Sequence, residues 1–224
     1  MDHNASGQLE VITGCMFSGK TEEMIRRLKR VLIANRKFLL LKPTIDDRYG
    51  PSIVNTHDGY GGLNGILLKP GEETTKGLQF VLGYNDMKPT SIKEVSSVEF
   101  VARIEETGKS LIDEADVIAF DEGQFFSEKL PALCEELVAM GKRVIVAGLD
   151  LNFAGEPFWP MPNLMALADY VDKFQAVCVI CGGTATRTQR LDEHGNPVSG
   201  DQPEIVVGGI TLYQARCHNC QVNP

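Results

Sequence analysis

The chain has 224 residues, 43% of them hydrophobic, and a formal net charge of −8. This length allows one large domain, or one domain with a small appendage, and the hydrophobic fraction suffices for a buried core. The acidic balance disfavours a protein that grips a nucleic-acid backbone, because such a surface is normally basic. We therefore expect a soluble enzyme that concentrates its few cations at one anionic site and has no nucleic-acid partner.

No apolar run reaches the roughly 18 residues that a membrane span needs. Residues 1–7 lack the charged and apolar segments of a signal peptide. The sequence thus predicts no membrane association and a cytoplasmic location.

The first motif along the chain is residues 14–21, G-C-M-F-S-G-K-T, which fits the phosphate-binding pattern G-x-x-x-x-G-K-[ST]. An apolar run at 9–13 predicts a strand before it, and 21–37 predicts a helix after it. In that context the backbone N–H groups of the loop and the positive end of the helix dipole favour phosphate binding. The alternative interpretation of the motif is a chance Gly-rich turn. Lys20 is expected to neutralise the outer phosphates, and Thr21 to ligate Mg²⁺. The predicted phosphate-binding residues are Gly14, Cys15, Met16, Phe17, Ser18, Gly19, Lys20 and Thr21.

The helix after the loop has apolar positions at helical spacing, and its cations lie on the other face. We interpret these cations as a solvated surface. They are Arg26, Arg27, Lys29 and Arg30.

Apolar runs at 38–41, 117–120 and 143–148 predict three further strands, with a helix at 128–140 between the last two. Short, almost continuously apolar strands separated by helices are typical of a parallel sheet covered on both faces. Residues 44–83 are predicted to be mostly loop, and after Phe174 the composition changes to Gly, Thr, Arg, Pro and paired cysteines. We expect an α/β fold with a phosphate-binding domain at 8–174 and a small metal-held module at 175–224.

The strand predicted at 117–120 ends in two carboxylates, Asp121 and Glu122. In phosphate-loop enzymes such a strand lies beside the loop, and its first acid holds Mg²⁺ directly or through water. The second acid then lies near the terminal phosphate and can act as general base. A polar strand end followed by a turn is the alternative interpretation.

Four of the six cysteines form two C-x-x-C pairs, Cys178 with Cys181 and Cys217 with Cys220. Without a secretion signal, this pattern favours structural zinc over a redox dithiol or plain buried cysteines. The gap between the pairs is longer than the 15–20 residues, roughly, of a zinc ribbon, so the metal would close a long loop. Such a loop could fold over a small ligand. Cys15 has no neighbouring base, and Cys134 is predicted to be core.

Together these motifs resemble the thymidine kinase family shared by animal cytosol, bacteria and poxviruses. The residues that carry the resemblance are 14–21, 56–58, 120–126, 148–150, 153, 157–158, 178, 181, 188–190, 207–209, 213, 217 and 220.

The resemblance implies a RecA-like ATP-binding domain with a zinc-bound lasso domain, and transfer of the ATP γ-phosphate to the 5′-hydroxyl of thymidine and of deoxyuridine. It implies that Glu122 is the general base and that Asp121 holds Mg²⁺ through water, with Asp58 in the same ATP site. It also implies a homotetramer, with a homodimer as the alternative, and feedback inhibition by thymidine triphosphate. The matching thymidine-pocket positions are Met16, Phe125, Leu149, Phe153, Thr188, Val207, Gly208 and Tyr213.

Three departures from the family pattern stand out. Residues 67–110 are predicted to contain an insertion, Gly59 stands where some members carry Arg, and Ile210-Thr211-Leu212 replaces more polar residues. The competing hypothesis is a helicase-like, zinc-containing ATPase, which D-E-G-Q at 121–124 also resembles. A helicase needs a second lobe, for which this chain has no room. A GTPase is disfavoured because the chain lacks the guanine motif of that class. A non-enzymatic interaction module is disfavoured because Lys20, Thr21 and both acids, which such a module would not need, are all present.

Overall fold

The computed structural model describes residues 7–43, 111–200 and 212–222, with short strands at 53–54, 63–64 and 66–68. Asp58, Val207, Gly208 and almost all of the predicted insertion lie outside the described residues.

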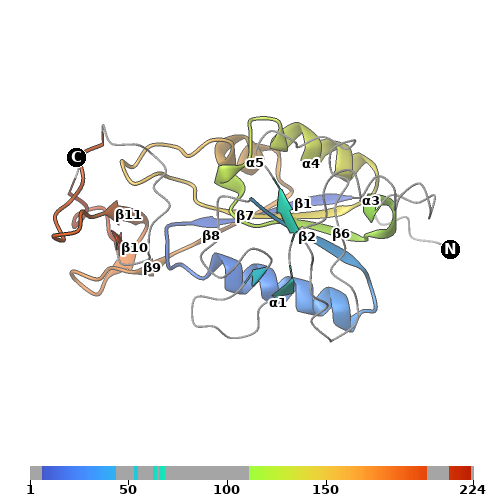
Figure 1. Cartoon of the computed structure of the whole chain (residues 1–224), viewed down its shortest axis with the longest axis horizontal. Helices are drawn as coiled ribbons and strands as arrows, with labels where there is room; N and C mark the ends of the chain where they lie inside the picture. The colour runs from blue at the N-terminus through green and yellow to red at the C-terminus, as the bar shows by residue number, and fades with distance from the viewer. Residues whose placement is uncertain are drawn as a thin grey trace.

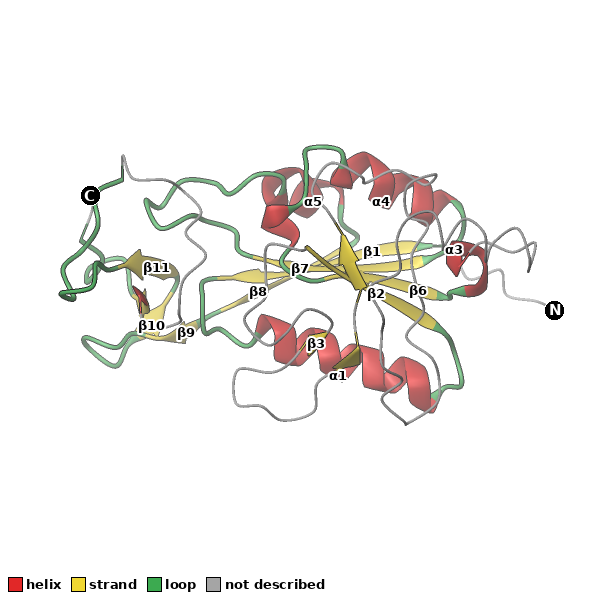
Figure 2. Ribbon diagram, viewed as in Figure 1, coloured by secondary structure: helices red, strands yellow, loops and turns green. Residues whose placement is uncertain are grey.

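A six-stranded parallel sheet forms the centre of the molecule (Figures 1 and 2). Its strand order is β5-β2-β6-β7-β1-β8, and each adjacent pair runs parallel. The strands are β1 (Gln8–Gly14), β2 (Phe38–Pro43), β5 (Ile66–Leu68), β6 (Val117–Phe120), β7 (Arg143–Gly148) and β8 (Tyr170–Phe174). The predicted bounds of β6 and β7 are confirmed, and β1 and β2 extend the predicted runs.

The sequence analysis missed β8 because this strand lies at the edge of the sheet, where its residues are mostly exposed. Its sequence, Y-V-D-K-F, therefore lacks the continuous apolar run of a central parallel strand.

Helices cover both faces of the sheet. Helix α1 (Lys20–Ile33) lies on one face, and α4 (Leu130–Ala139) and α5 (Met161–Leu167) lie on the other (Figure 2). The short helix α3 (Leu111–Glu114) leads into β6, and a 3₁₀ turn, η1 (Gly123–Phe125), follows β6.

Helix α1 ends earlier than predicted because the chain leaves it through a left-handed residue. Asn35 has φ 52°, and the N–H groups of Asn35 and Arg36 donate to the carbonyl oxygens of Leu32 and Val31. This is the Schellman arrangement that satisfies the last carbonyl groups of a helix. Gly141, with φ 81°, closes α4 in the same way.

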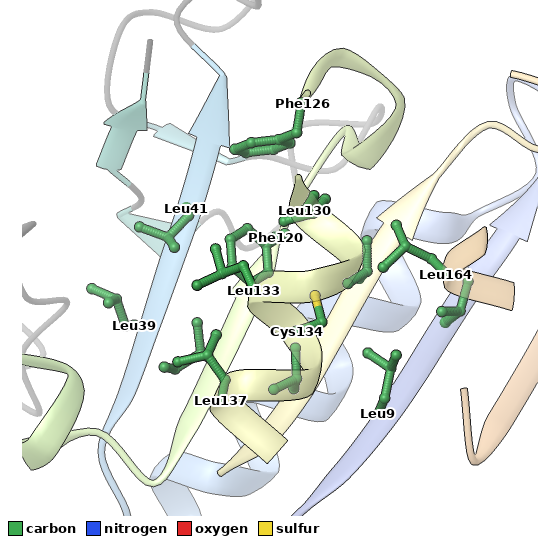
Figure 3. Close-up of a cluster of buried hydrophobic side chains, with 14 of the residues drawn as sticks. Leu9, Leu39, Leu41, Phe120, Phe126, Leu130, Leu133, Cys134, Leu137 and Leu164 are labelled. Atoms are coloured by element: carbon green, nitrogen blue, oxygen red, sulfur yellow. The ribbon is translucent and has the colours of Figure 1, made fainter. Parts of the chain in front are cut away.

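Alternate residues of the strands pack against opposite helical layers, which explains why the strands are apolar throughout. Figure 3 shows Leu133 and Leu137 of α4 over Leu39, Leu41 and Phe120 of the sheet. Cys134 is fully buried in this cluster, which confirms its assignment to the core. On the other face, Met24, Leu28 and Val31 of α1 pack on the intervening strand residues.

The chain beyond β8 forms a small module of short antiparallel strands at one end of the sheet (Figure 1). Here β9 (Ala176–Val177) pairs with β10 (Thr184–Ala185), and β11 (Arg187–Arg190) pairs with β12 (Tyr213–Arg216). A further pair, β3 (Ile53–Val54) with β4 (Leu63–Asn64), lies within the predicted loop region. Within the described ranges, no helix has the length and apolar character to cross a membrane.

The interpretation of the α1 cations as a solvated face was wrong for Arg27. Its guanidinium donates to Glu10 of β1 at 2.6 Å and to Glu23 at 2.8 Å, and it also pairs with Asp172 of β8. Arg143 of β7 donates to the other oxygen of Glu10 at 2.5 Å. An ion-pair cluster centred on the buried Glu10 therefore ties α1 to three strands.

We predict that Glu10→Gln destabilises the fold at neutral pH and weakens its dependence on acid. Burial raises the pKa of Glu10, but the hydrogen bonds and charges of Arg143 and Arg27 outweigh it, so the pKa is lowered from 4.5. This contribution is complete above the pKa of the unfolded chain and is lost as the pH falls through the lower folded value. Because Arg143 is partly exposed, we expect a loss of about 2–3 kcal/mol at pH 7 rather than the full value of a buried pair.

Urea unfolding of the parent protein and of Glu10→Gln from pH 7 to pH 3 measures this effect. The difference between their free energies of unfolding should become smaller as the pH falls. The control is Glu136→Gln, on the exposed side of α4, which should stay within about 0.5 kcal/mol of the parent. A difference in free energy of unfolding that stays constant across this range would contradict the stabilising role of the ionised Glu10.

Candidate functional site

The phosphate loop leaves β1 at a glycine that no other residue could replace. A Cβ on Gly14, which has φ 139°, would lie 2.2 Å from the carbonyl oxygen of Phe174 in β8. Phe17 and Gly19 also have positive φ, at 63° and 86°. These turns fold the loop back so that α1 begins at Lys20, as a phosphate cradle at a helix N-terminus requires.

Side chains of the loop bond back to the loop itself. The Ser18 hydroxyl donates to the Cys15 carbonyl oxygen at 2.8 Å, and Lys20 Nζ donates to the same oxygen at 2.7 Å. Burial lowers the pKa of Lys20, against the opposing charges of Glu122 and Asp150. An entering phosphate would stabilise the ammonium form that burial disfavours.

The carboxylate pair lies at the carboxyl end of β6, close to the loop. Thr21 Oγ1 donates to Asp121 Oδ1 at 3.5 Å, and Asp121 is buried. A hydroxyl and a carboxylate are oxygen ligands of the kind that Mg²⁺ prefers, so the donor set fits this ion. In the sheet, β7 separates β6 from β1, the strand that leads into the loop, and the carboxyl end of β6 reaches the loop at Thr21.

Glu122 begins the 3₁₀ turn in an unusual conformation. Its φ is 53°, in the left-handed region, and its side chain is half-buried. The neighbouring Gln124 donates to Glu122 Oε2 at 2.7 Å. Sequence reasoning assigned no role to Gln124, although D-E-G-Q at 121–124 could have drawn attention to it.

Asp150, which follows β7, is a second residue to which the sequence analysis gave no role. Its carboxylate is buried, and Lys173 Nζ of β8 lies 2.7 Å from Oδ2. Within the described part of the chain, neither carboxylate oxygen has an aligned hydrogen-bond partner. Its negative charge acts on Lys20, so Asp150 belongs to the electrostatic surroundings of the phosphate loop.

The loop also contacts the cysteine module directly. The backbone N–H of Met16 donates to the Thr188 hydroxyl at 3.0 Å, and Cys15 Sγ donates to the Ala185 carbonyl oxygen at 3.4 Å. Cys15 is buried with Cys178 and Ala185, and burial raises the pKa of its thiol. Cys15 thus packs between the loop and the module, which its sequence position did not reveal.

The residues predicted to line a thymidine pocket occupy several environments. Met16, Phe125, Leu149 and Tyr213 are half-buried, whereas Phe153 and Thr188 are buried. The guanidinium of Arg190 lies 5.1 Å from the centre of the Phe153 ring, which links the segment after β7 to the module. The structure therefore joins Met16 to Thr188, and Phe153 to β11.

The four paired cysteines converge in the module. Their sulfur atoms all lie within 4.8 Å of one another, and the Sγ atoms of Cys181 and Cys217 are 3.8 Å apart. Zinc–sulfur bonds of about 2.3 Å in a tetrahedron place the sulfurs about 3.8 Å apart, so the cluster fits Zn²⁺. Hydrogen bonds, first from the backbone of Cys217, lower the pKa of Cys178 to about 6, whereas hydrogen bonds to Cys217 and Cys181 raise the pKa of Cys220 to about 12. The thiols thus share protons within the cluster, and metal binding would release them.

If the four cysteines hold Zn²⁺, we predict that a chelator exposes Cys15 to alkylation. Cys15 packs on Cys178, Ala185 and Ala215, so loosening the module should uncover its thiol. Cys134 lies on the buried face of α4, away from the module, and is the internal control. Peptide mapping after iodoacetamide treatment, with and without a chelator, measures the extent of alkylation at Cys15 and at Cys134. Reaction at Cys15 should increase while Cys134 stays protected; equal protection of both after chelation would contradict the packing argument.

Comparisons with known proteins agree with this geometry. The family model described as thymidine kinase matches residues 7–64 and 63–221. A thymidine kinase of Haloquadratum walsbyi is 42% identical over 217 residues, covering 97% of this chain and 96% of that protein. A thymidine kinase of Coprothermobacter proteolyticus is 44% identical over 212 residues, covering 95% of this chain and 89% of that protein.

Among solved structures, the flagellar accessory protein FlaH from Methanocaldococcus jannaschii aligns with 80% of this chain and 76% of its own. Its TM-score is 0.39 at 14% identity, too low to establish a shared fold. The family match and the curated relatives extend over nearly the whole sequence, from the phosphate loop to the last cysteine pair. The chain belongs to the thymidine kinase family.

Proposed function

We propose that this chain transfers the γ-phosphate of ATP to the 5′-hydroxyl of thymidine. The observation that carries the proposal is the junction of a phosphate loop, two carboxylates and a cysteine-held module at one end of a parallel sheet. A phosphate loop alone supports ATP binding, whereas the module that is bonded to this loop supports a second, enclosed substrate.

The phosphate site would contain Lys20, Thr21 and Asp121. Lys20 neutralises the outer phosphates, and the Thr21 hydroxyl and Asp121 hold Mg²⁺ directly or through water. When it is bound, Mg²⁺ would neutralise the negative charge that develops on the β- and γ-phosphates during transfer. Asp58 is proposed for the same site from the family resemblance.

Glu122 is proposed as the general base. Its carboxylate takes the proton of the 5′-hydroxyl while the oxygen forms a bond to the γ-phosphorus. The bond from that phosphorus to the bridging oxygen breaks, and ADP leaves with the electron pair. The half-buried position of Glu122, one residue beyond Asp121, supports this role.

The cysteine module is proposed to hold thymidine. A nucleoside is uncharged, so its binding needs a dry pocket and a cover. Zn²⁺ on Cys178, Cys181, Cys217 and Cys220 would order this cover in advance. The resemblance suggests that backbone groups, including those of Val207 and Gly208, hydrogen-bond the thymine. Apolar contacts around its C5-methyl favour thymidine over deoxyuridine by only about 1–3 kcal/mol.

Four further expectations stay predictions: a homotetramer, inhibition by thymidine triphosphate, turnover of deoxyuridine and a cytoplasmic location. The division into domains at 8–174 and 175–224 is also a prediction.

The direct test is ATP- and Mg²⁺-dependent phosphorylation of a nucleoside panel by the purified protein. Selective turnover of thymidine, with weaker turnover of deoxyuridine, is expected. ATP hydrolysis without nucleoside phosphorylation would overturn the proposed substrate and favour the helicase-like ATPase.

For the general base, we predict that Glu122→Gln lowers kcat at least about 100-fold while thymidine binding is retained. The amide keeps the shape of the side chain but cannot accept the proton. Glu128→Gln, an exposed position six residues further on, is the matched control and should leave kcat unchanged. A near-normal kcat in Glu122→Gln would remove Glu122 from this role.

A further inference from the structure

We propose that Gln124 is a positioning residue that orients the carboxylate of Glu122 and links it to the end of β7. This inference rests on the proposed role of Glu122 as general base. Gln124 itself contacts no reacting atom in this account; it acts through Glu122.

Both ends of the Gln124 amide are bonded. Nε2 donates to Glu122 Oε2 at 2.7 Å, and Oε1 accepts from the backbone N–H of Leu149 at 2.9 Å. The residue is only 3% exposed, so water does not compete for these bonds. A buried amide that lost either partner would leave a polar group unsatisfied, at a cost of about 1–3 kcal/mol.

The two partners also fix which way the amide faces. A carboxylate can only accept, and a backbone N–H can only donate. A flipped amide would place its oxygen against the Glu122 carboxylate and its NH₂ against the Leu149 N–H. The orientation that donates to Glu122 is therefore the only one that satisfies both neighbours.

Packing confines the side chain to this position. A Cβ on Gly148 would lie 2.8 Å from Gln124 Oε1 and 2.6 Å from Met161 Sδ. A Cβ on Gly123 would lie 2.7 Å from Val146 Cγ1. Gly148 thus leaves room for the Gln124 amide, and Gly123 lets the preceding turn pack closely on β7.

Glu122 needs such a partner because its backbone is unusual and its side chain is long. A non-glycine residue with φ 53° is uncommon, and the 3₁₀ turn supports it through the bond from the Phe125 N–H to the Glu122 carbonyl oxygen at 2.9 Å. A half-buried glutamate has several accessible rotamers. The hydrogen bond that Gln124 donates favours one of them.

The second bond of Gln124 gives the arrangement a further consequence. Leu149 is one of the proposed thymidine-pocket residues, and its backbone N–H is bonded to the same amide that holds Glu122. The base and this wall of the pocket are therefore joined through a single side chain. A shift of Leu149 would be transmitted to the Glu122 carboxylate.

Gln124→Met tests the inference, because methionine has a similar length but neither donates nor accepts in this way. We expect the single-turnover rate of phosphoryl transfer to fall about 10–100-fold, the range seen when supporting residues of a site are removed. The KM values for ATP and thymidine should change less than the rate.

Gln189→Met is the matched control. Gln189 is also fully buried and also accepts a backbone N–H, from Val222 at 2.9 Å, but it lies in β11 of the cysteine module. The same substitution there should not lower the single-turnover rate of phosphoryl transfer selectively over the KM values. A second variant, Gln124→Glu, keeps the shape and the acceptor for Leu149 but removes the donor, so it tests the inference if the methionine variant does not fold.

A double-mutant cycle separates this inference from the general-base assignment. In a Glu122→Gln background, Gln124→Met should cause little further loss, because the group it positions is already disabled. If Glu122→Gln is inactive but folded Gln124 variants keep the parental single-turnover rate, only the positioning role is overturned. If Glu122→Gln retains activity, the general-base assignment is overturned, and the positioning role with it.

Discussion

The contact between the phosphate loop and the cysteine module is the constraint on which the site depends. The Met16 N–H donates to the Thr188 hydroxyl, and Cys15 packs against Cys178 and Ala185. These contacts bring a nucleotide-binding loop and a metal-ligating cluster, far apart in sequence, to one place. The loop by itself would bind phosphate, and the module by itself would be a small cysteine-held fold. Their contact makes a two-substrate site possible.

The parallel sheet determines where that contact can form. The carboxyl ends of β1, β6 and β7 lead into the phosphate loop, the Asp121–Glu122 pair and Asp150, and β8 continues into the module. Parallel strands end at the same edge of a sheet, so these groups converge without long connections. The ion pairs of Glu10 with Arg27 and Arg143 meanwhile hold α1, and therefore the helix end that carries Lys20 and Thr21, on this sheet.

The sequence was sufficient for features that depend on local pattern. The bounds of β6 and β7 followed from apolar runs, and the convergence of the four cysteines followed from their spacing. Features that depend on a distant partner were missed or misread: the edge strand β8, the paired state of Arg27, the hydrogen bonds of Gln124, and the position of the buried Asp150 beside Lys173. These features involve exposed or polar residues, and their partners are brought close only by the topology of the fold. A local sequence pattern therefore does not reveal them.

The most direct test of this account is calorimetric titration of thymidine into the protein with its metal present and after chelation. If the module forms the thymidine pocket and rests on the phosphate loop, chelation should weaken thymidine binding strongly. Binding of a non-hydrolysable ATP analogue should weaken less, because Lys20 and Thr21 lie in the sheet domain. Unchanged thymidine affinity in protein confirmed to be metal-free would contradict the account.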